Sequence, residues 1–175
     1  YTYSWGRTPW FDNWAREHFA TREGVALFDM SSFAKFRLEG PDAEAVLQDV
    51  CTCDAAIAAG DVRYTQWLNK NGGIEADLTI SRLNSDTFLV VTGAAAATRD
   101  FVWLKKHIGD RRAAATDVTA GLSSLGLMGP KSRDALQAMC DDDISDNALP
   151  YRGALDIEIG YAPVRAVRIS YMGEL

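Results

Sequence analysis

The sequence is poor in the residues that build metal sites and catalytic triads. Its 175 residues include two histidines, His18 and His107, and three cysteines, Cys51, Cys53 and Cys140. The cysteines lack both the paired spacing of a zinc site and the even number of a secreted disulfide framework. Two histidines leave few candidates for a His-based metal site or a Ser-His-Asp triad. We therefore predict no metal site and a reduced compartment, either the cytoplasm or, in a eukaryote, the mitochondrial matrix.

Long apolar runs and an excess of positive charge are also missing. No apolar run approaches the roughly 18 to 20 residues needed to span a bilayer, and no signal-peptide pattern opens the chain. The net charge of −6 and pI near 4.9 argue against a dedicated nucleic-acid binder. A basic cluster at residues 105–112 is typical of the last turn of a helix. We expect a soluble domain without membrane or nucleic-acid partners.

The ends of the sequence predict a piece of a longer protein. The chain begins with Tyr1 rather than Met, and Leu175 follows a strand-like segment directly. With 47% hydrophobic residues, the chain can bury the core of one domain or of two small lobes. Residues 1–14 are aromatic and irregular, and such a leader normally packs on a neighbouring surface.

The most informative stretch is residues 69–80, where a turn precedes an alternating strand. Asn71, Gly72 and Gly73 tolerate positive φ and predict a tight turn between two strands. Apolar residues then alternate with polar ones, in the order Ile74, Glu75, Ala76, Asp77, Leu78, Thr79, Ile80, Ser81. One face should therefore lie in a core while the other presents two carboxylates. Asp77 is our first candidate for a reactive carboxylate, and the alternative is a solvated polar face of an antiparallel sheet.

The remaining pattern is that of an α+β protein. Helical spacing and capping signals predict helices over residues 12–22, 42–51, 98–108 and 131–139. Alternation and turn signals predict strands over residues 33–39, 62–68, 74–83, 87–92, 118–128, 155–160 and 162–171. The acidic residues 141–143 open a polar linker that reaches about residue 153.

An internal repeat relates the two halves of the chain. Residues 36–48, which contain Gly40-Pro41 and Leu47-Gln48, are echoed by residues 125–137 with a constant offset of 89 positions. Both copies combine a strand, a Gly-Pro turn and a helix, so each half resembles a β-α-β-β-α-β unit. Two such units side by side would form a cleft, where ligands usually bind, while a purely structural duplication is the alternative.

Four segments together resemble one family. They are residues 28–36 (Phe-Asp-Met-Ser-Ser-Phe-Ala-Lys-Phe), 72–79 (Gly-Gly-Ile-Glu-Ala-Asp-Leu-Thr), 125–130 (Leu-Gly-Leu-Met-Gly-Pro) and 168–175 (Arg-Ile-Ser-Tyr-Met-Gly-Glu-Leu). The family is the folate-binding aminomethyltransferase (glycine-cleavage T-protein-like) family. The version fused behind the flavin domain of dimethylglycine and sarcosine dehydrogenases matches best. A free T-protein typically has two aspartates where this chain has Ala76-Asp77.

The resemblance implies a fold of tandem ferredoxin-like (β-α-β-β-α-β) lobes with the second lobe truncated. It divides the chain into an aromatic leader and helix at residues 1–24, a first folate-binding lobe at residues 25–117 and the start of a second, incomplete lobe at residues 118–175. Tetrahydrofolate would bind between the lobes and accept a one-carbon unit as 5,10-methylene-tetrahydrofolate.

The resemblance also implies roles for four residues. The Asp matching Asp77 lies near folate N5 and N10, where a carboxylate can accept the proton that an attacking nitrogen loses. The Glu matching Glu174 binds the pterin ring, whose adjacent N–H and amino groups suit one carboxylate. Tyr171 and Tyr64 are candidates to line the ring, and the alternative for each is a core position.

FAD is expected only in a separate, covalently linked domain, because Gly72-Gly73 lacks the spacing of a flavin-binding motif. The resemblance implies capture of the oxidised N-methyl carbon, delivered as an iminium, on folate. Two alternatives are a free-standing aminomethyl or methyl transferase to folate and a non-catalytic folate-binding regulatory module.

Overall fold

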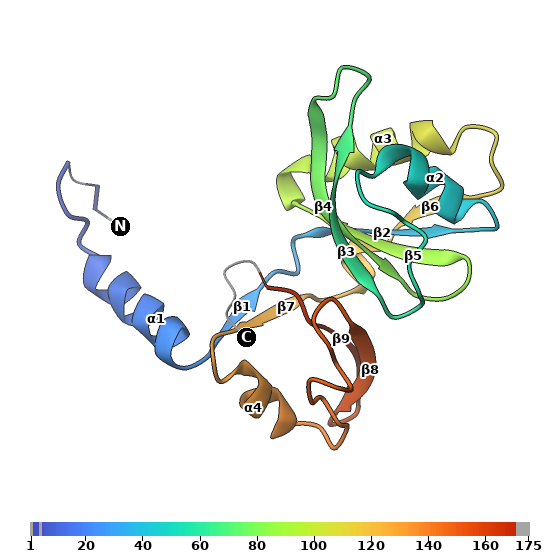
Figure 1. Cartoon of the computed structure of the whole chain (residues 1–175). Coiled ribbons are helices and arrows are strands. Elements are labelled where there is room, and N and C mark those ends of the chain that lie inside the picture. Colours follow the sequence, from blue (N-terminus) through green and yellow to red (C-terminus); the bar gives the residue numbers. More distant parts are fainter. Residues whose placement is uncertain (1, 4, 171–175) are drawn as a thin grey trace.

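A five-stranded antiparallel sheet forms the upper part of the computed structural model (Figure 1), which describes residues 2, 3 and 5–170. Its strands run in the order β3-β4-β5-β2-β6. They are β2 (Ala34–Glu39), β3 (Val62–Leu68), β4 (Ile74–Arg82), β5 (Thr87–Thr92) and β6 (Ala114–Asp117). Helix α2 (Ala43–Val50) follows β2, and α3 (Ala97–Ile108) follows β5 after a short 3-10 turn, η1 (Ala94–Ala96). Along the chain these elements follow the order β2, α2, β3, β4, β5, α3, β6, so three strands lie between the two helices.

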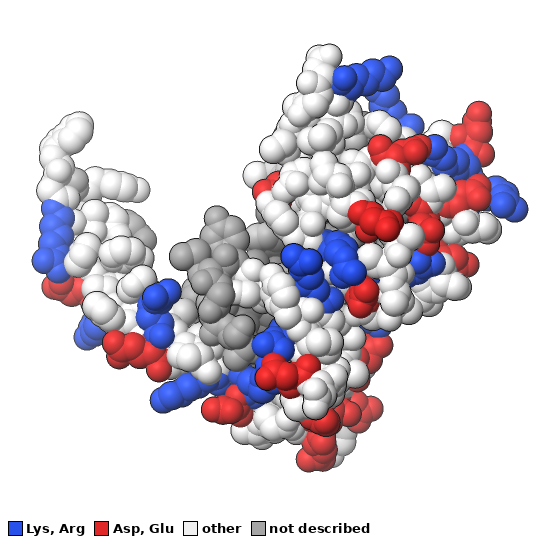
Figure 2. All heavy atoms as spheres, viewed as in Figure 1, with Lys and Arg blue, Asp and Glu red and all other residues white. Residues whose placement is uncertain are grey.

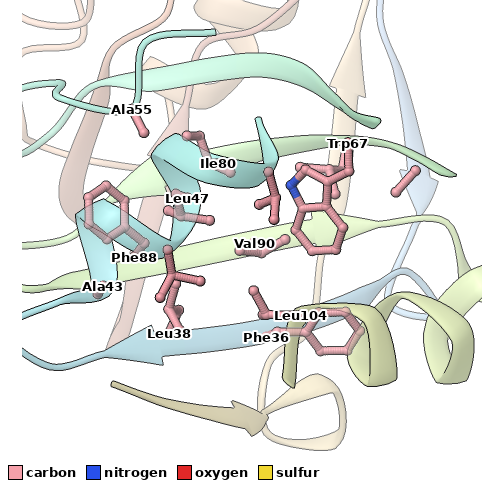
Figure 3. Close-up of a cluster of buried hydrophobic side chains, with 14 of the residues drawn as sticks. Phe36, Leu38, Ala43, Leu47, Ala55, Trp67, Ile80, Phe88, Val90 and Leu104 are labelled. Carbon is pink, nitrogen blue, oxygen red and sulfur yellow. The ribbon is translucent and has the colours of Figure 1, made fainter. Parts of the chain in front are cut away.

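Both helices pack on the same face of this sheet and enclose the main core (Figure 3). The core includes Phe36, Trp67, Ile80 and Phe88 from the strands and Leu47 from α2, all fully buried. These residues follow the expected periods of two in the strands and 3.6 in the helices. The helix-covered face is therefore the apolar one, and the opposite face carries the alternate residues of each strand.

A second, two-stranded sheet joins distant parts of the chain. Strand β1 (Ala26–Asp29) pairs antiparallel with β7 (Leu125–Met128), in register from Ala26 opposite Met128 to Asp29 opposite Leu125. Helix α1 (Phe11–Glu23) precedes β1, extends away from the rest of the molecule and buries no residue (Figure 1). The predicted strand at residues 118–128 is correct only for its last four residues, because residues 119–121 form a 3-10 turn, η2 (Thr119–Gly121). Strand β6 was not predicted.

The second half of the chain has its own smaller core. Helix α4 (Ser132–Gln137) is followed by the antiparallel pair β8 (Ala154–Ile159) and β9 (Ala162–Val167). Cys140, Ile144, Leu149, Ile157 and Ala166 form its buried cluster. The domain boundaries after residues 24 and 117 stay predictions, since β1 hydrogen-bonds to β7 across the second of them.

The repeat seen in the sequence has a counterpart in the backbone. Gly40 and Gly129 both have positive φ, 129° and 123°, at the turn from strand to helix. A Cβ on either residue would lie within 2.5 Å of a backbone carbonyl oxygen, that of Arg112 for Gly40 and that of Gly24 for Gly129. The two turns thus share a conformation that only glycine fits.

Charged side chains of both signs are interspersed over the face seen in Figure 2. Of the basic cluster at residues 105–112, Arg111 pairs with Asp49 and Arg112 with Asp42. These two guanidinium groups therefore fasten the end of α3 to residues in and next to α2. None of the helices in the described part of the chain is both long and apolar enough to cross a membrane.

Candidate functional site

Strand β4 presents Asp77 on the face of the sheet away from the helices. Its neighbours Ala76 and Leu78 are buried in the core, while Asp77 is exposed, as the alternation predicted. The prediction was wrong for two other residues of the strand. Ile74 is 69% exposed because it lies at the tip of the β3–β4 hairpin, and Ser81 is buried although it lies on the polar face.

The turn before β4 is built around one side chain. Asn69 Oδ1 accepts the backbone N–H groups of Asn71 and Gly73, at 2.9 and 3.0 Å, and Gly72 takes the predicted positive φ of 78°. Asn69 Nδ2 donates to Glu75 Oε1 at 2.9 Å. Glu75 is therefore engaged in holding the turn, and Asp77 is the carboxylate of the strand that remains available to a ligand.

Strand pairing brings two residues of β3 beside Asp77. Gln66 lies directly opposite Asp77, and Tyr64 lies opposite Thr79, the next residue on the same face. Side chains that lie opposite each other in an antiparallel pair have Cβ atoms about 4.5–5.5 Å apart. Tyr64 is 61% exposed. The alternative of a core position for Tyr64 is therefore excluded, and Tyr64 lies on the same face as Asp77. Its role in lining a ligand stays a prediction.

The row that contains Tyr64 continues across the sheet to a buried lysine. Thr79 is opposite Val91 of β5, and Val91 is opposite Lys35 of β2. Lys35 is 3% exposed, and its Nζ donates to the carbonyl oxygens of Ser31 and Phe33 at 3.0 and 2.9 Å. The ammonium therefore fixes the turn of residues 31–33, which leads from β1 into β2.

Two carboxylates near Lys35 are held in the ionised form. Hydrogen bonds from Ser31, reinforced by the charge of Lys35, lower the pKa of Asp29 below its ordinary value. Hydrogen bonds from Thr119 and the same charge lower the pKa of Asp117.

Sequence reasoning did not single out Lys35 or Gln66 as site residues. Their signal is the strand register, which a single sequence does not fix.

The other two predicted site residues, Tyr171 and Glu174, lie outside the described residues. The chain that leads to them is fastened at Arg168, whose guanidinium bonds to Asp146 and whose backbone N–H donates to Gly153 O at 3.0 Å. Arg152 N–H donates in turn to Arg168 O at 2.9 Å. The segment after β9 therefore starts from a defined position beside residues 150–153.

Two hollows in the described part of the molecule lie away from this face. One of about 430 Å³ is lined by residues 137–142 with Glu158 and Gly160, next to α4 and β8. Neither Asp77 nor Tyr64 is among its lining residues. The described residues also hold no group of three or more His, Cys, Asp or Glu side chains placed to bind a metal.

The face around Asp77 can perform acid–base and binding chemistry. Asp77 supplies a carboxylate that accepts hydrogen bonds or a proton, Gln66 supplies an amide, and Tyr64 supplies an aromatic ring with a polar end. These three groups come from two adjacent strands of one sheet, which positions them more rigidly than loops would. The arrangement suits a flat heterocyclic ligand that carries N–H groups.

Curated relatives match this chain over its whole length. A 4-methylaminobutanoate oxidase (formaldehyde-forming) of Paenarthrobacter nicotinovorans is 45% identical over 175 residues, covering 100% of this chain and 21% of that protein. Human mitochondrial dimethylglycine dehydrogenase is 30% identical over 177 residues, covering 100% of this chain and 20% of its own length. The chain thus spans about a fifth of these relatives.

A solved structure supports the fold. The glycine cleavage system aminomethyltransferase T from Bartonella henselae superposes with a TM-score of 0.75 at 28% identity, covering 91% of this chain and 42% of that one. The mixed α+β architecture is therefore that of the T-protein over nearly the whole length described. The model of the GCVT N-terminal domain matches residues 1–175. The chain belongs to the GCVT N-terminal domain family.

Proposed function

We propose that this chain is the tetrahydrofolate-binding, one-carbon transfer domain of a flavin-dependent amine oxidase or dehydrogenase. The observation that carries the proposal is Asp77, an exposed carboxylate on the polar face of the sheet, beside the exposed ring of Tyr64. Family membership and the similarity to an oxidase and a dehydrogenase of methylated amines support it. The finer fold that we propose is a tandem of β-α-β-β-α-β lobes, in which β7, α4, β8 and β9 begin the second lobe.

The residues present fit a reduced folate. Its pterin and aminobenzoyl rings need an apolar surface, its nitrogens need a proton acceptor, and the β3–β4 face offers the Tyr64 ring beside the Asp77 carboxylate. When bound, tetrahydrofolate supplies two nucleophilic nitrogens that receive a carbon at the oxidation level of formaldehyde. Asp77 would accept the proton that the first nitrogen loses on bonding to the iminium carbon, and it would return this proton to the amine nitrogen. The bond between that amine and the carbon would break as the second nitrogen closes the ring and releases its own proton to solvent.

Glu174 and Tyr171 are proposed to complete the site from the segment after β9, with Glu174 accepting hydrogen bonds from the pterin edge. The iminium would come from oxidation of a methylated amine in a flavin domain elsewhere in the same polypeptide. We propose the cytoplasm as the compartment, or the mitochondrial matrix in a eukaryote, as the name of the human relative specifies for that protein.

The test uses the full-length parent enzyme with Asp77→Ala and with Glu75→Gln as its matched control, because Glu75 is engaged with Asn69. We expect Asp77→Ala to lower formation of 5,10-methylene-tetrahydrofolate by about 100-fold and to raise release of free formaldehyde, since general-base help contributes roughly that factor or more. Glu75→Gln should retain the wild-type yield. An unchanged product yield in Asp77→Ala would overturn the role of Asp77.

A free-standing aminomethyltransferase is the second candidate, and the likeness to the T-protein structure favours it. The two proposals differ in the source of carbon. Supplying the parent protein with dimethylglycine, sarcosine or 4-methylaminobutanoate without oxygen, and following reduction of a bound flavin, separates them. Flavin reduction coupled to folate product supports the fused enzyme. Folate product from a preformed aminomethyl donor alone, with none from these N-methyl amines, supports the free transferase.

A further inference from the structure

Gln66 lies opposite Asp77 and is held by a closed hydrogen-bond chain that begins in the core. Thr65 is 1% exposed, and its Oγ1 accepts the backbone N–H groups of Thr52 and Cys53 at 3.1 and 3.2 Å. A hydroxyl has two acceptor positions and one proton to donate. Both acceptor positions of Thr65 are thus filled, and its hydroxyl can only donate. The acceptors within reach are Thr52 Oγ1 at 3.2 Å and the Gln66 carbonyl oxygen at 3.4 Å, of which Thr52 Oγ1 is the nearer.

The next link fixes the direction of the Gln66 amide. Thr52 Oγ1 accepts the Gln66 backbone N–H at 3.3 Å as well as the Thr65 proton, and it donates its own proton to Gln66 Oε1 at 3.2 Å. The carboxamide oxygen is therefore occupied on the Thr52 side. The amide nitrogen of Gln66, which carries two N–H donors, is therefore on the side of the carboxamide away from the Thr52 hydroxyl. Among the described residues, neither Gln66 Nε2 nor the Asp77 carboxylate makes a hydrogen bond.

We propose that Gln66 is a positioning residue for Asp77. Its amide, oriented by Thr52 and Thr65, donates one N–H to the Asp77 carboxylate when ligand is bound and holds the second carboxylate oxygen toward the reacting nitrogen. The cross-strand placement brings a donor and an acceptor within reach on one face. This inference rests on the proposed function of Asp77 and assigns the residue that sets its geometry.

The alternative role for Gln66 is structural, as an acceptor for the Thr52 hydroxyl. Gln66→Glu separates the two roles, because a carboxylate still accepts from Thr52 but has no N–H to donate to Asp77. In the full-length parent we expect Gln66→Glu and Gln66→Leu each to lower kcat for folate product about 10-fold, with KM for tetrahydrofolate within about 2-fold, since positioning losses act on the chemical step. Wild-type kcat in Gln66→Glu would overturn the proposal.

Two variants of Thr52 test the orienting link. Thr52→Val keeps the shape but removes the hydroxyl, and we expect it to lower kcat about 3-fold. Thr52→Ser restores the hydroxyl and should restore kcat. Equal rates for the valine and serine variants would exclude the link through Thr52. The Gln66 variants and Thr52→Ser should melt within a few degrees of the wild type, because Thr52 is exposed and Gln66 is only half-buried. Thr52→Val should melt lower, because it removes the Thr52 acceptor of the buried Thr65 hydroxyl.

A readout that needs no turnover keeps this inference separate from the proposed function. In ¹H–¹⁵N spectra of the full chain with tetrahydrofolate added, the Gln66 side-chain NH₂ signals should shift in Asp77→Ala and stay in place in the distant control Asp156→Asn. Failure of the wild-type parent to make folate product overturns the proposed function. If the chemical shifts of the Gln66 side-chain NH₂ group are unchanged in Asp77→Ala, the proposed hydrogen bond between Gln66 and Asp77 is wrong.

Discussion

Gln48 and Gln137, 89 positions apart, each accept the backbone N–H of the residue seven positions further along the chain. Gln48 Oε1 accepts from Ala55 N at 2.7 Å, and Gln137 Oε1 accepts from Ile144 N at 3.4 Å. Both donor residues are buried. Gln48 lies in the last turn of α2 and Gln137 is the last residue of α4, and each folds the following loop back onto its helix. The internal repeat therefore extends beyond the Gly-Pro turns into side-chain contacts.

Replacing either glutamine should destabilise the fold. Gln48→Met and Gln137→Met keep the side-chain length but leave a buried N–H without an acceptor, which costs about 1–3 kcal/mol. Because the sites are far apart, the double variant should show the sum of both losses. Urea unfolding measures the free energy of unfolding of each variant. The control is Lys70→Met, at an exposed position, whose free energy of unfolding should stay within about 0.5 kcal/mol of the wild type. Losses as small as that of Lys70→Met would show that the two bonds add no stability.

The glycines of the repeat should be equally intolerant of a side chain. Gly40→Ala and Gly129→Ala place a Cβ against a carbonyl oxygen at positive φ, and we expect each to cost about 2–4 kcal/mol. Gly121→Ala is the matched control, since a Cβ there meets nothing within 4 Å and φ is not positive. Thermal unfolding compares the three. A Gly129→Ala variant as stable as Gly121→Ala would contradict the steric account.

Most of the first sheet could be predicted because its signals are local. The limits of β3 and β5 were predicted to the residue, and α2 and α3 to within one, since apolar period and turn residues mark them directly. Strand β6 was missed because Ala114–Asp117 is too short and polar to alternate visibly. It exists because Arg37 and Leu38 of β2 offer an open edge opposite Thr116 and Ala115. Such pairing is a tertiary effect that a local pattern does not contain.

The candidate site was predicted in part for the same reason. Alternation alone put Asp77 on the polar face, and the structure agrees. Alternation within β4 does not predict which residue of β3 lies opposite Asp77. A shift of one residue in the register would place Trp67 there instead of Gln66. The contact of Lys35 with the turn of residues 31–33 also depends on how the chain folds back. Tyr171 and Glu174 stay predictions.

Tyr64 should matter for ligand affinity. Its ring is 61% exposed and lies on the Asp77 face, where a ligand can reach it. Loss of a stacking surface should weaken binding of tetrahydrofolate about 10-fold. Calorimetric titration of the full-length parent measures the affinity, and Tyr64→Phe should retain it. Equal affinity in Tyr64→Ala would remove Tyr64 from the site.

Acid should weaken the link between α2 and the end of α3. Hydrogen bonds from the Arg112 backbone N–H, at 2.8 Å, and from its guanidinium lower the pKa of Asp42 below its ordinary value of 3.8. In this pH range the unfolded chain binds more protons than the folded one, so the stabilisation is present above about pH 4 and disappears as pH falls through the lowered pKa. Urea midpoints measured from pH 5 downward should fall more steeply for the wild type than for Asp42→Asn. If the urea midpoints of the wild type and of Asp42→Asn fall in parallel with pH, the contact between Asp42 and Arg112 adds no stability.

Cys51 should be chemically inert in the folded chain and should limit alkaline stability. Burial raises the pKa of its thiol to about 12, against an opposing hydrogen bond from Trp67 Nε1 at 3.3 Å. The thiolate is the reactive form, so alkylation of Cys51 by iodoacetamide at pH 8 should be at least about 100-fold slower in the folded chain than in urea.

The raised pKa of Cys51 also means that the folded chain retains a proton that the unfolded chain loses above about pH 9. The free energy of unfolding therefore falls from about pH 9 toward pH 12. Mass spectrometry of peptides containing Cys51 follows the first effect, and unfolding of Cys51→Ala, which should lose less stability above pH 9, follows the second. Rapid labelling of Cys51 in the folded chain would contradict the burial of its sulfur against Trp67.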